Sequence, residues 1–252
     1  MARRLLLAGC LALLLGTAGH ATLHNTPRGS IVLWAWERPE DLRFLSGSGV
    51  GVAFLDRTIV VRSVPHSNPP IPQFETMLRR QPLRLARGTP LIAVVRIEAA
   101  VADDRIVPRL SNEILGAARV PGVSAIQIDF DATLSQRPLY TTLLRAVRGG
   151  LPHNIRLSVT ALASWCSDDP WIDPHDVDEI VPMLFRMGPE ARRVITRLSE
   201  EGRWPVDACN SAVGVSTDER WRVVPAVERV YVFNPRSWRA EDLRRAGRPL
   251  AD

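Results

Sequence analysis

Apolar, β-branched runs recur along the chain and alternate with segments of helical periodicity. Eight of these runs have the length and composition of β-strands. They are Ile31–Trp36, Gly51–Leu55, Leu91–Ile97, Ala125–Asp131, Arg156–Ala163, Ile180–Met187, Ser211–Ser216 and Val230–Asn234. Apolar residues at helical spacing predict helices between several of the strands and one more near the end of the chain. These helices are Leu110–Arg119, Leu139–Val147, Glu190–Glu201, Asp218–Glu228 and Ala240–Ala246.

Strands that alternate with helices are typical of a parallel sheet, and eight such strands favour a closed barrel. We therefore predict one α/β domain over residues 22–252, an eight-stranded parallel (β/α)8 TIM-type barrel. The first units are irregular. Thr58–Val64 and Leu83–Leu85 are candidates for an extra β-hairpin outside the barrel after the second strand. The proline-rich segment Pro65–Pro72 between them is expected to be an exposed loop.

Several predicted strands alternate between apolar and polar side chains, whereas strands buried on both faces would be apolar throughout. On the fourth strand one face comprises Ile126, Ile128 and Phe130, and the other comprises Gln127, Asp129 and Asp131. The third strand alternates in the same way, with Arg96 and Glu98 on one face. The apolar faces should contact the helices, and the polar faces should point into the barrel.

Five charged side chains should consequently meet near the C-terminal ends of neighbouring strands, where barrel enzymes carry their active sites. They are Arg96, Glu98, Asp129, Asp131 and Arg186. Buried charges need partners, and two guanidinium groups against three carboxylates leave one acid in excess. Such an acid is suited to a raised pKa and to proton donation. An ion network that only closes the barrel is the alternative.

Five of the seven tryptophans fall at or near the same predicted end of the barrel. They are Trp34, Trp36, Trp165, Trp171 and Trp238. The flat faces of indole rings can stack on the C–H faces of sugar rings, which favours a carbohydrate site. Ordinary packing of loops over the barrel rim is the alternative.

The basic residues change the range of functions that the chain can perform. All 32 are arginine and none is lysine, and they are interleaved with 27 acidic residues. Without lysine there can be no Schiff-base aldolase, no pyridoxal-phosphate enzyme and no Walker-type phosphate loop. The arginines do not cluster, so nucleic acid is not an expected partner. Only five histidines occur, and we expect no metal and no cofactor.

The first 21 residues have the features of a secretory signal. Arg3 and Arg4 precede the apolar stretch Leu5–Leu15, and small residues suit cleavage after Ala21. Lipidation at Cys10 is the weaker alternative, because the apolar stretch continues beyond it. We expect a periplasmic or secreted protein without a membrane span after cleavage.

Two cysteines remain after removal of the signal, Cys166 and Cys209. An oxidising compartment would permit a disulfide between them. The predicted strands place them near opposite ends of the fold, so we expect two separate thiols.

Three longer motifs carry a resemblance to a known family. The segments Ile126–Ala132, Leu157–Cys166 and Val177–Gly188 resemble the bacterial family filed as domain of unknown function 3142. The resemblance extends from about Val32 to Gly188 and implies a barrel domain similar to glycoside hydrolases, with no settled activity. The matching residues here are Glu98, Asp129, Asp131, Trp165, Cys166, Arg186 and Met187.

A looser resemblance is to chitinase-type barrels, which carry alternating acids at the end of the fourth strand. Their series closes with a glutamate that protonates the leaving oxygen. Here Thr133 stands where that glutamate would be, which argues against chitinase-like catalysis.

We therefore expect an exported barrel that binds an envelope or extracellular polysaccharide, or an oligosaccharide, and hydrolyses it. Asp131 and Glu98 are the candidate catalytic pair, while Asp129 would hold Arg96 or position the sugar. The candidate substrate-binding residues are Arg96, Arg186, Trp36 and Trp165. Two alternatives remain open: a non-catalytic polysaccharide-binding barrel, and a structural envelope protein.

Overall fold

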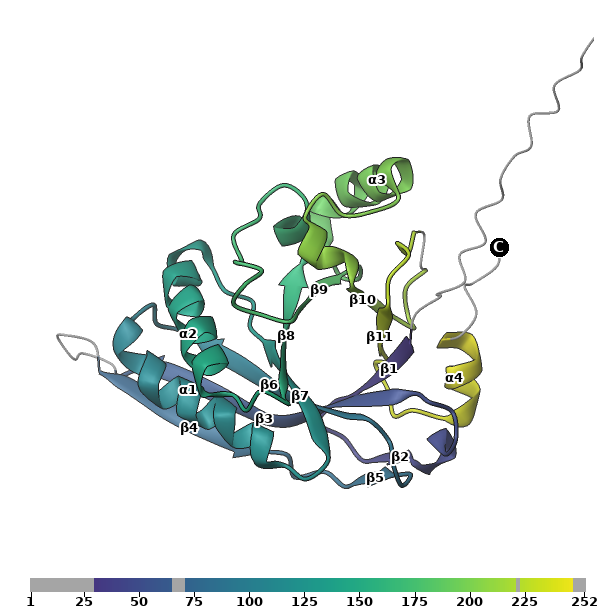
Figure 1. Ribbon diagram of the computed structural model, residues 1–252, viewed down its shortest axis with the longest axis horizontal. Helices are drawn as coiled ribbons and strands as arrows, with labels where there is room; N and C mark the ends of the chain where they lie inside the picture. Colours follow the sequence, from purple (N-terminus) through teal and green to yellow (C-terminus); the bar gives the residue numbers. More distant parts are fainter. Residues whose placement is uncertain (1–29, 65–70, 221–222, 247–252) are drawn as a thin grey trace, which may run out of the picture.

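A closed barrel of eight parallel strands forms the centre of the computed structural model, which describes residues 30–64, 71–220 and 223–246 (Figure 1). The strands follow the order β1-β11-β10-β9-β8-β7-β6-β3, and β1 pairs with β3 to close the ring. Their bounds are β1 Ser30–Ala35, β3 Gly51–Ser63, β6 Leu91–Ala99, β7 Val123–Asp129, β8 Arg156–Leu162, β9 Glu179–Met183, β10 Ala212–Ser216 and β11 Arg229–Phe233. The eight predicted strands and their parallel closure are confirmed. The expected signal segment lies outside the described residues.

Side-chain alternation divides the core of the protein into two layers. Outside the barrel, Ile126 and Ile128 of β7 share a buried cluster with Leu110 and Leu143, from α1 (Val107–Gly116) and α2 (Arg137–Gly150). Each fully buried leucine of this kind stabilises the fold by about 1.5–3 kcal/mol. Inside the barrel a second cluster includes Val94 of β6 and residues from most of the other strands. The predicted inward and outward faces of β7 are therefore correct.

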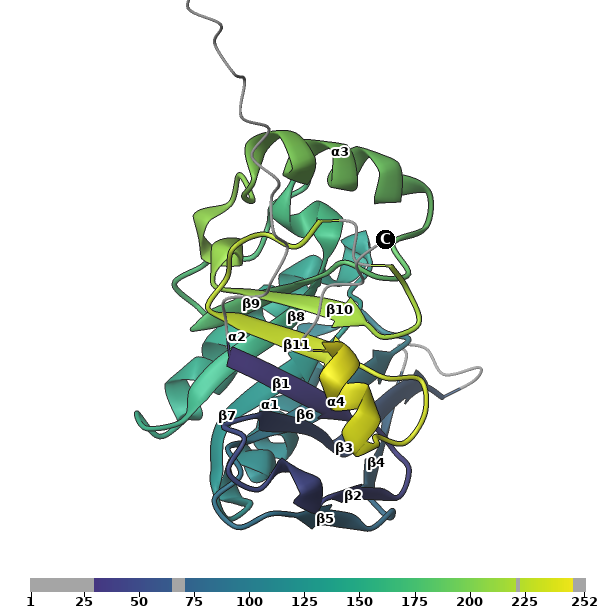
Figure 2. The same cartoon turned by 90° about the vertical axis from the view of Figure 1, so that its right-hand side faces the viewer.

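The helices cover the barrel unevenly. α1 and α2 lie against each other outside β6 and β7, α3 (Ala191–Glu201) follows β9, and α4 (Ala240–Ala246) follows β11 (Figures 1 and 2). Within the described ranges no α-helix follows the other four barrel strands, so the regular alternation of a (β/α)8 barrel is not observed.

The predicted helix Asp218–Glu228 is wrong over its described residues, which are turn, bend and chain without regular secondary structure. Pro225 explains the difference. Proline lacks the N–H that a helix interior requires and disfavours helical geometry at the residue before it.

The extra antiparallel pair exists with a different partner from the one expected. The second half of β3 pairs with β4 (Pro72–Leu78), so that Thr58 lies opposite Met77. Leu83–Leu85 instead forms β5, which pairs in parallel with β2 (Glu40–Leu42) in a separate two-stranded sheet. The mixed polar and apolar sequence of β4 gives little strand signal, which is why its pairing was missed. Most of the expected loop Pro65–Pro72 lies outside the described residues.

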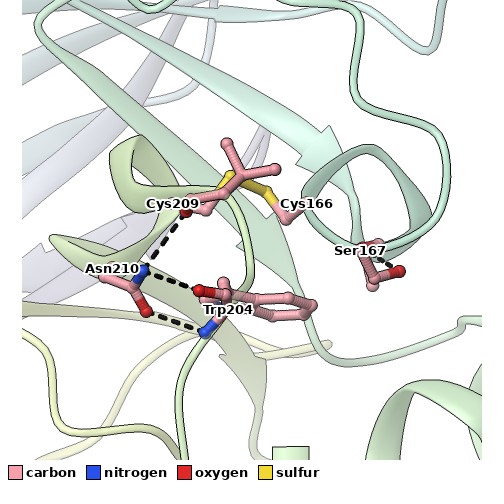
Figure 3. The surroundings of a disulfide bond; sticks show 7 residues. Cys166, Ser167, Trp204, Cys209 and Asn210 are labelled. Atoms are coloured by element: carbon pink, nitrogen blue, oxygen red, sulfur yellow. Dashed lines mark hydrogen bonds between the residues drawn. A yellow bond between two sulfur atoms is a disulfide. The ribbon is translucent and has the colours of Figure 1, made fainter. Parts of the chain in front are cut away.

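Cys166 and Cys209 form a disulfide, so the prediction of two separate thiols is wrong (Figure 3). Cys166 ends the 3-10 helix Ala163–Cys166 after β8, and Cys209 lies in the 3-10 helix Asp207–Asn210 before β10. Both helices contact β9, which has only five residues. Because β9 is so short, the segment after β8 and the segment before β10 meet over it, and the two cysteines come within bonding distance.

Loss of the disulfide should destabilise the protein strongly. Because the two cysteines are separated by 43 residues, chain-entropy arguments predict that replacing both with alanine lowers the unfolding free energy by about 4 kcal/mol. Urea unfolding of the wild type and the double variant measures this difference. Reduced wild type should match the variant, and an unchanged midpoint in either sample would contradict the prediction.

Candidate functional site

A cavity of about 820 Å³ opens at the C-terminal mouth of the barrel. Charged, aromatic and aliphatic side chains from both the barrel strands and β4 line it. The lining residues include Trp34, Trp36, Glu37, Thr58, Met77, Leu78, Arg80, Gln81, Arg96, Glu98, Asp129, Asp131, Thr160, Leu162, Met183, Phe185, Arg186 and Phe233. Six of the seven residues predicted from sequence are among them.

Arg96 connects the acidic residues on one side of the cavity. Its Nε donates to Glu98 Oε1 at 2.9 Å, and its Nη1 donates to Asp129 Oδ2 at 3.3 Å. The other carboxylate oxygen of Asp129, Oδ1, accepts a hydrogen bond of 2.8 Å from Thr160. Both oxygens of Asp129 are thus engaged, and its side chain is only 15% exposed, whereas that of Glu98 is 49% exposed.

The register of the parallel strands brings these groups together. Arg96 of β6 is paired with Asp129 of β7 and with Thr58 of β3. Side chains two residues apart on one strand share a face, so Glu98 continues the inward row of Arg96 toward the mouth. Asp131 follows the end of β7 by two residues and lines the same cavity. The predicted convergence of the acids with Arg96 is therefore observed.

Asp131 is the carboxylate that stays available to a ligand. It is exposed in the cavity, and within the described residues it accepts no hydrogen bond and lies in no ion pair shorter than 4 Å.

The pKa of the Asp129 carboxyl is raised above its ordinary value of 3.8, mainly by burial. The hydrogen bond from Thr160 opposes this rise, and the negative charge of Asp131 adds to it. The sequence predicted two guanidinium groups for three carboxylates, whereas among the described residues Arg96 alone forms ion pairs with this group, to Glu98 and Asp129.

Thr133 does not replace the missing glutamate of chitinase-type barrels. It precedes the short helix Leu134–Gln136 that leads into α2, and its backbone N–H donates to Gln136 Oε1 at 3.0 Å. Gln136 in turn donates through Nε2 to the backbone carbonyl of Ala99. The position therefore serves helix initiation, and Thr133 does not line the cavity.

Aromatic rings occupy the side of the cavity away from the acids. Phe185 and Phe233 stack with ring centroids 5.6 Å apart, and Trp36 meets Phe233 edge-on at 6.4 Å. In the strand order β11, which carries Phe233, is four strands from β7 in either direction. The guanidinium of Arg96 lies 5.5 Å from the centre of the Trp36 ring and thereby connects the two sides.

Arg186 lies at the rim but does not pair with the three central carboxylates as expected. Its guanidinium lies 5.3 Å from the Phe233 ring centre and 3.7 Å from Asp218 Oδ2. The structure ends β9 at Met183, so Arg186 belongs to the following loop, where its φ of +52° is unusual for a non-glycine residue. Its backbone N–H donates to Glu219 Oε1 at 3.0 Å, which holds this strained conformation.

The structure places Trp165 away from the cavity, which differs from its expected role as a stacking platform. The ring is buried outside the barrel and packs edge-on against Trp171 at 4.9 Å. The chain turns outward directly after β8, and this turn explains the placement.

Sequence reasoning missed the contribution of β4 and the loop beside it. Arg79, just after β4, donates to the backbone carbonyls of Trp36 and Arg38 at 2.7 and 2.6 Å. Glu37 accepts hydrogen bonds from the backbone N–H of Arg80 and of Gln81. These contacts fix Trp36 beside the mouth, and only the unpredicted pairing of β3 with β4 could have revealed them.

No group of three or more histidine, cysteine, aspartate or glutamate side chains that could hold a metal ion occurs in the described part of the chain. The same residues include no helix that is long and apolar enough to cross a membrane.

Comparison with known families supports the resemblance to the domain of unknown function over part of its predicted extent. A family model described as "Domain of unknown function (DUF3142)" matches residues 87–183. The matched segment contains Arg96, Glu98, Asp129 and Asp131, and it ends before Arg186. No curated protein matches the chain.

The raised pKa of Asp129 should be visible in the pH dependence of stability. The protonated Asp129 carboxyl contributes stability that is fully present below the pKa of this group in the unfolded chain. That stability is lost as pH rises through the raised pKa of the group in the folded protein. The side chain of the Asp129→Asn variant cannot titrate. The unfolding free energy of the wild type minus that of the variant should therefore fall as pH rises above 3.8. Urea unfolding across a pH series measures it, and a difference that grows with pH would contradict the raised pKa.

Proposed function

We propose that the protein is an exported carbohydrate-active barrel that binds a stretch of envelope or extracellular polysaccharide and hydrolyses it. The observation that carries the proposal is one cavity with carboxylates on the β6 and β7 side and aromatic rings on the β1, β9 and β11 side. Polar groups suit sugar hydroxyls, and aromatic rings suit the C–H faces of the sugar. A volume of about 820 Å³ is within the range of ordinary ligand sites.

Asp131 and Glu98 are the carboxylates best placed to reach a bound glycan. Asp129 lies deeper, with both oxygens engaged by Thr160 and Arg96, so it orients Arg96 rather than meeting the ligand. Arg96 donates to Glu98 as well, which fixes that side chain at the cavity. The family match over residues 87–183 contains this whole group.

In the proposed reaction one carboxyl of the pair gives its proton to the glycosidic oxygen. The bond from that oxygen to the anomeric carbon breaks, and the leaving sugar departs as an alcohol. The second carboxylate either attacks the anomeric carbon or removes a proton from a water that attacks it. In the first case a water then gives its proton to the first group and displaces the carboxylate from the anomeric carbon, which frees the sugar and restores both groups. In the second case the oxygen of the water bonds to the anomeric carbon directly, and exchange with solvent returns the proton from the second group to the first. Either way one water is consumed for each bond cleaved.

A non-catalytic polysaccharide-binding barrel is the second candidate. The observation that favours it is Thr133, which starts a helix at the position of the acid in chitinase-type barrels. In this version the same cavity binds the glycan, and Asp131 and Glu98 accept hydrogen bonds from its hydroxyls.

Activity on a panel of polysaccharides, read as release of new reducing ends, tests the first candidate. Asp131→Asn and Glu98→Gln should each lower the rate by a factor of about 100 or more, since removing a general acid or base costs 10²–10⁴. Asp104→Asn, an exposed aspartate outside the cavity lining, is the matched control and should keep the wild-type rate.

Calorimetry on the same panel separates the outcomes. Equal hydrolysis by wild type and Asp131→Asn would rule out the catalytic assignment. Binding without turnover would favour the second candidate. If no glycan is bound or cleaved, both candidates are wrong.

A further inference from the structure

Exposed aliphatic side chains gather at the same cavity. Among the described residues five large apolar side chains are exposed, and three of them line it: Met77, Leu78 and Leu162, which are 37%, 58% and 45% exposed. The other two, Ile71 and Leu134, do not line the cavity. Exposed apolar groups that concentrate at one concave site indicate contact with a ligand.

The position of these side chains relative to the acids follows from the sheet. Met77 and Leu78 end β4, and Leu162 ends β8. In the order β4-β3-β6-β7-β8 the strands that carry Arg96, Glu98 and Asp129 lie between them. An apolar flank therefore borders the polar group on each side, and Met183 extends the flank on the β9 side.

An unsubstituted sugar cannot use such flanks well. Its hydroxyl groups would lose water without gaining a partner from leucine or methionine. A flexible hydrocarbon chain gains from the same surfaces, because apolar area leaves water on both molecules. Leu78 is the most exposed of the three, and Met77 of the same strand also lines the cavity, so β4 supplies two exposed apolar side chains and β8 supplies one.

We propose that the saccharide bound in this cavity carries an alkyl or acyl chain, which packs on Met77 and Leu78 while the sugar lies at Arg96, Glu98 and Asp131. This inference rests on the proposed carbohydrate function and names the class of its ligand. Glycolipids, acylated glycans and alkyl glycosides share the required chemistry.

The test compares glycosides that differ only in the chain. The probes are the methyl and octyl β-glucosides and the methyl and octyl β-N-acetylglucosaminides, each below its micelle concentration, with octanoate as the chain without a sugar. A methylene that is fully removed from water strengthens binding about fourfold. Partial burial at the rim should therefore still give at least tenfold tighter binding of an octyl glycoside than of its methyl partner.

Leu78→Asn should reduce that ratio to less than threefold, and Met77→Gln should reduce it in the same direction. Both side chains are exposed, so neither change should disturb folding. Leu134→Asn is the matched control, because Leu134 is 74% exposed but lies outside the cavity lining, and it should keep the wild-type ratio.

Three results would overturn the inference. If octyl and methyl glycosides bind equally while glycans of the panel bind in the cavity, the chain makes no contact and the proposed function stands. If octanoate binds as tightly as the octyl glycosides, the site recognises the chain alone and the carbohydrate proposal fails with the inference. If neither glycosides nor glycans bind, both proposals fail.

Discussion

The ion pairs of Arg96 are the interaction on which the mouth of the barrel depends. A closed parallel barrel gives its inward side chains only a small space in common, and three carboxylates in that space would repel one another. Arg96 is bonded to Glu98 and Asp129 and lies over the Trp36 ring, so a single guanidinium fixes two carboxylates and one aromatic ring. Removing one partner of such a group leaves charge uncompensated, which is why these positions constrain each other.

Burial divides the three carboxylates into different roles. Asp129 is deep, with both oxygens hydrogen-bonded, and Glu98 is half exposed and held by Arg96. Asp131 is exposed and has no hydrogen-bond partner among the residues that the structure describes. The deeper acid sets the position of the guanidinium, and in the proposed function the shallower acids contact the ligand. The aromatic and aliphatic walls then supply the apolar contact that the charged side lacks.

Much of this arrangement could be predicted from two-residue alternation. Asp129 between Ile128 and Phe130 indicates that one face is polar, and eight β-branched runs that alternate with helices favour a closed parallel ring. The placement of residues in loops could not be predicted in this way, because a loop has no period. Trp165 and Arg186 each follow a strand by a few residues, and the local turn decides what each side chain contacts. The chain turns outward before Trp165, and Arg186 adopts a strained backbone conformation with a positive φ. The partner of the extended β3 was missed for a related reason, since β4 owes its place to tertiary pairing rather than to its own weak strand pattern.

The most direct test of the account is a crystal structure of the Asp131→Asn variant soaked with the oligosaccharide that binds best. The account predicts a sugar ring in the cavity, with hydroxyl groups within hydrogen-bond distance of Glu98 and of the substituted position, and with its C–H face toward Phe233. An oligosaccharide bound elsewhere on the surface, with the cavity free of sugar, would contradict it.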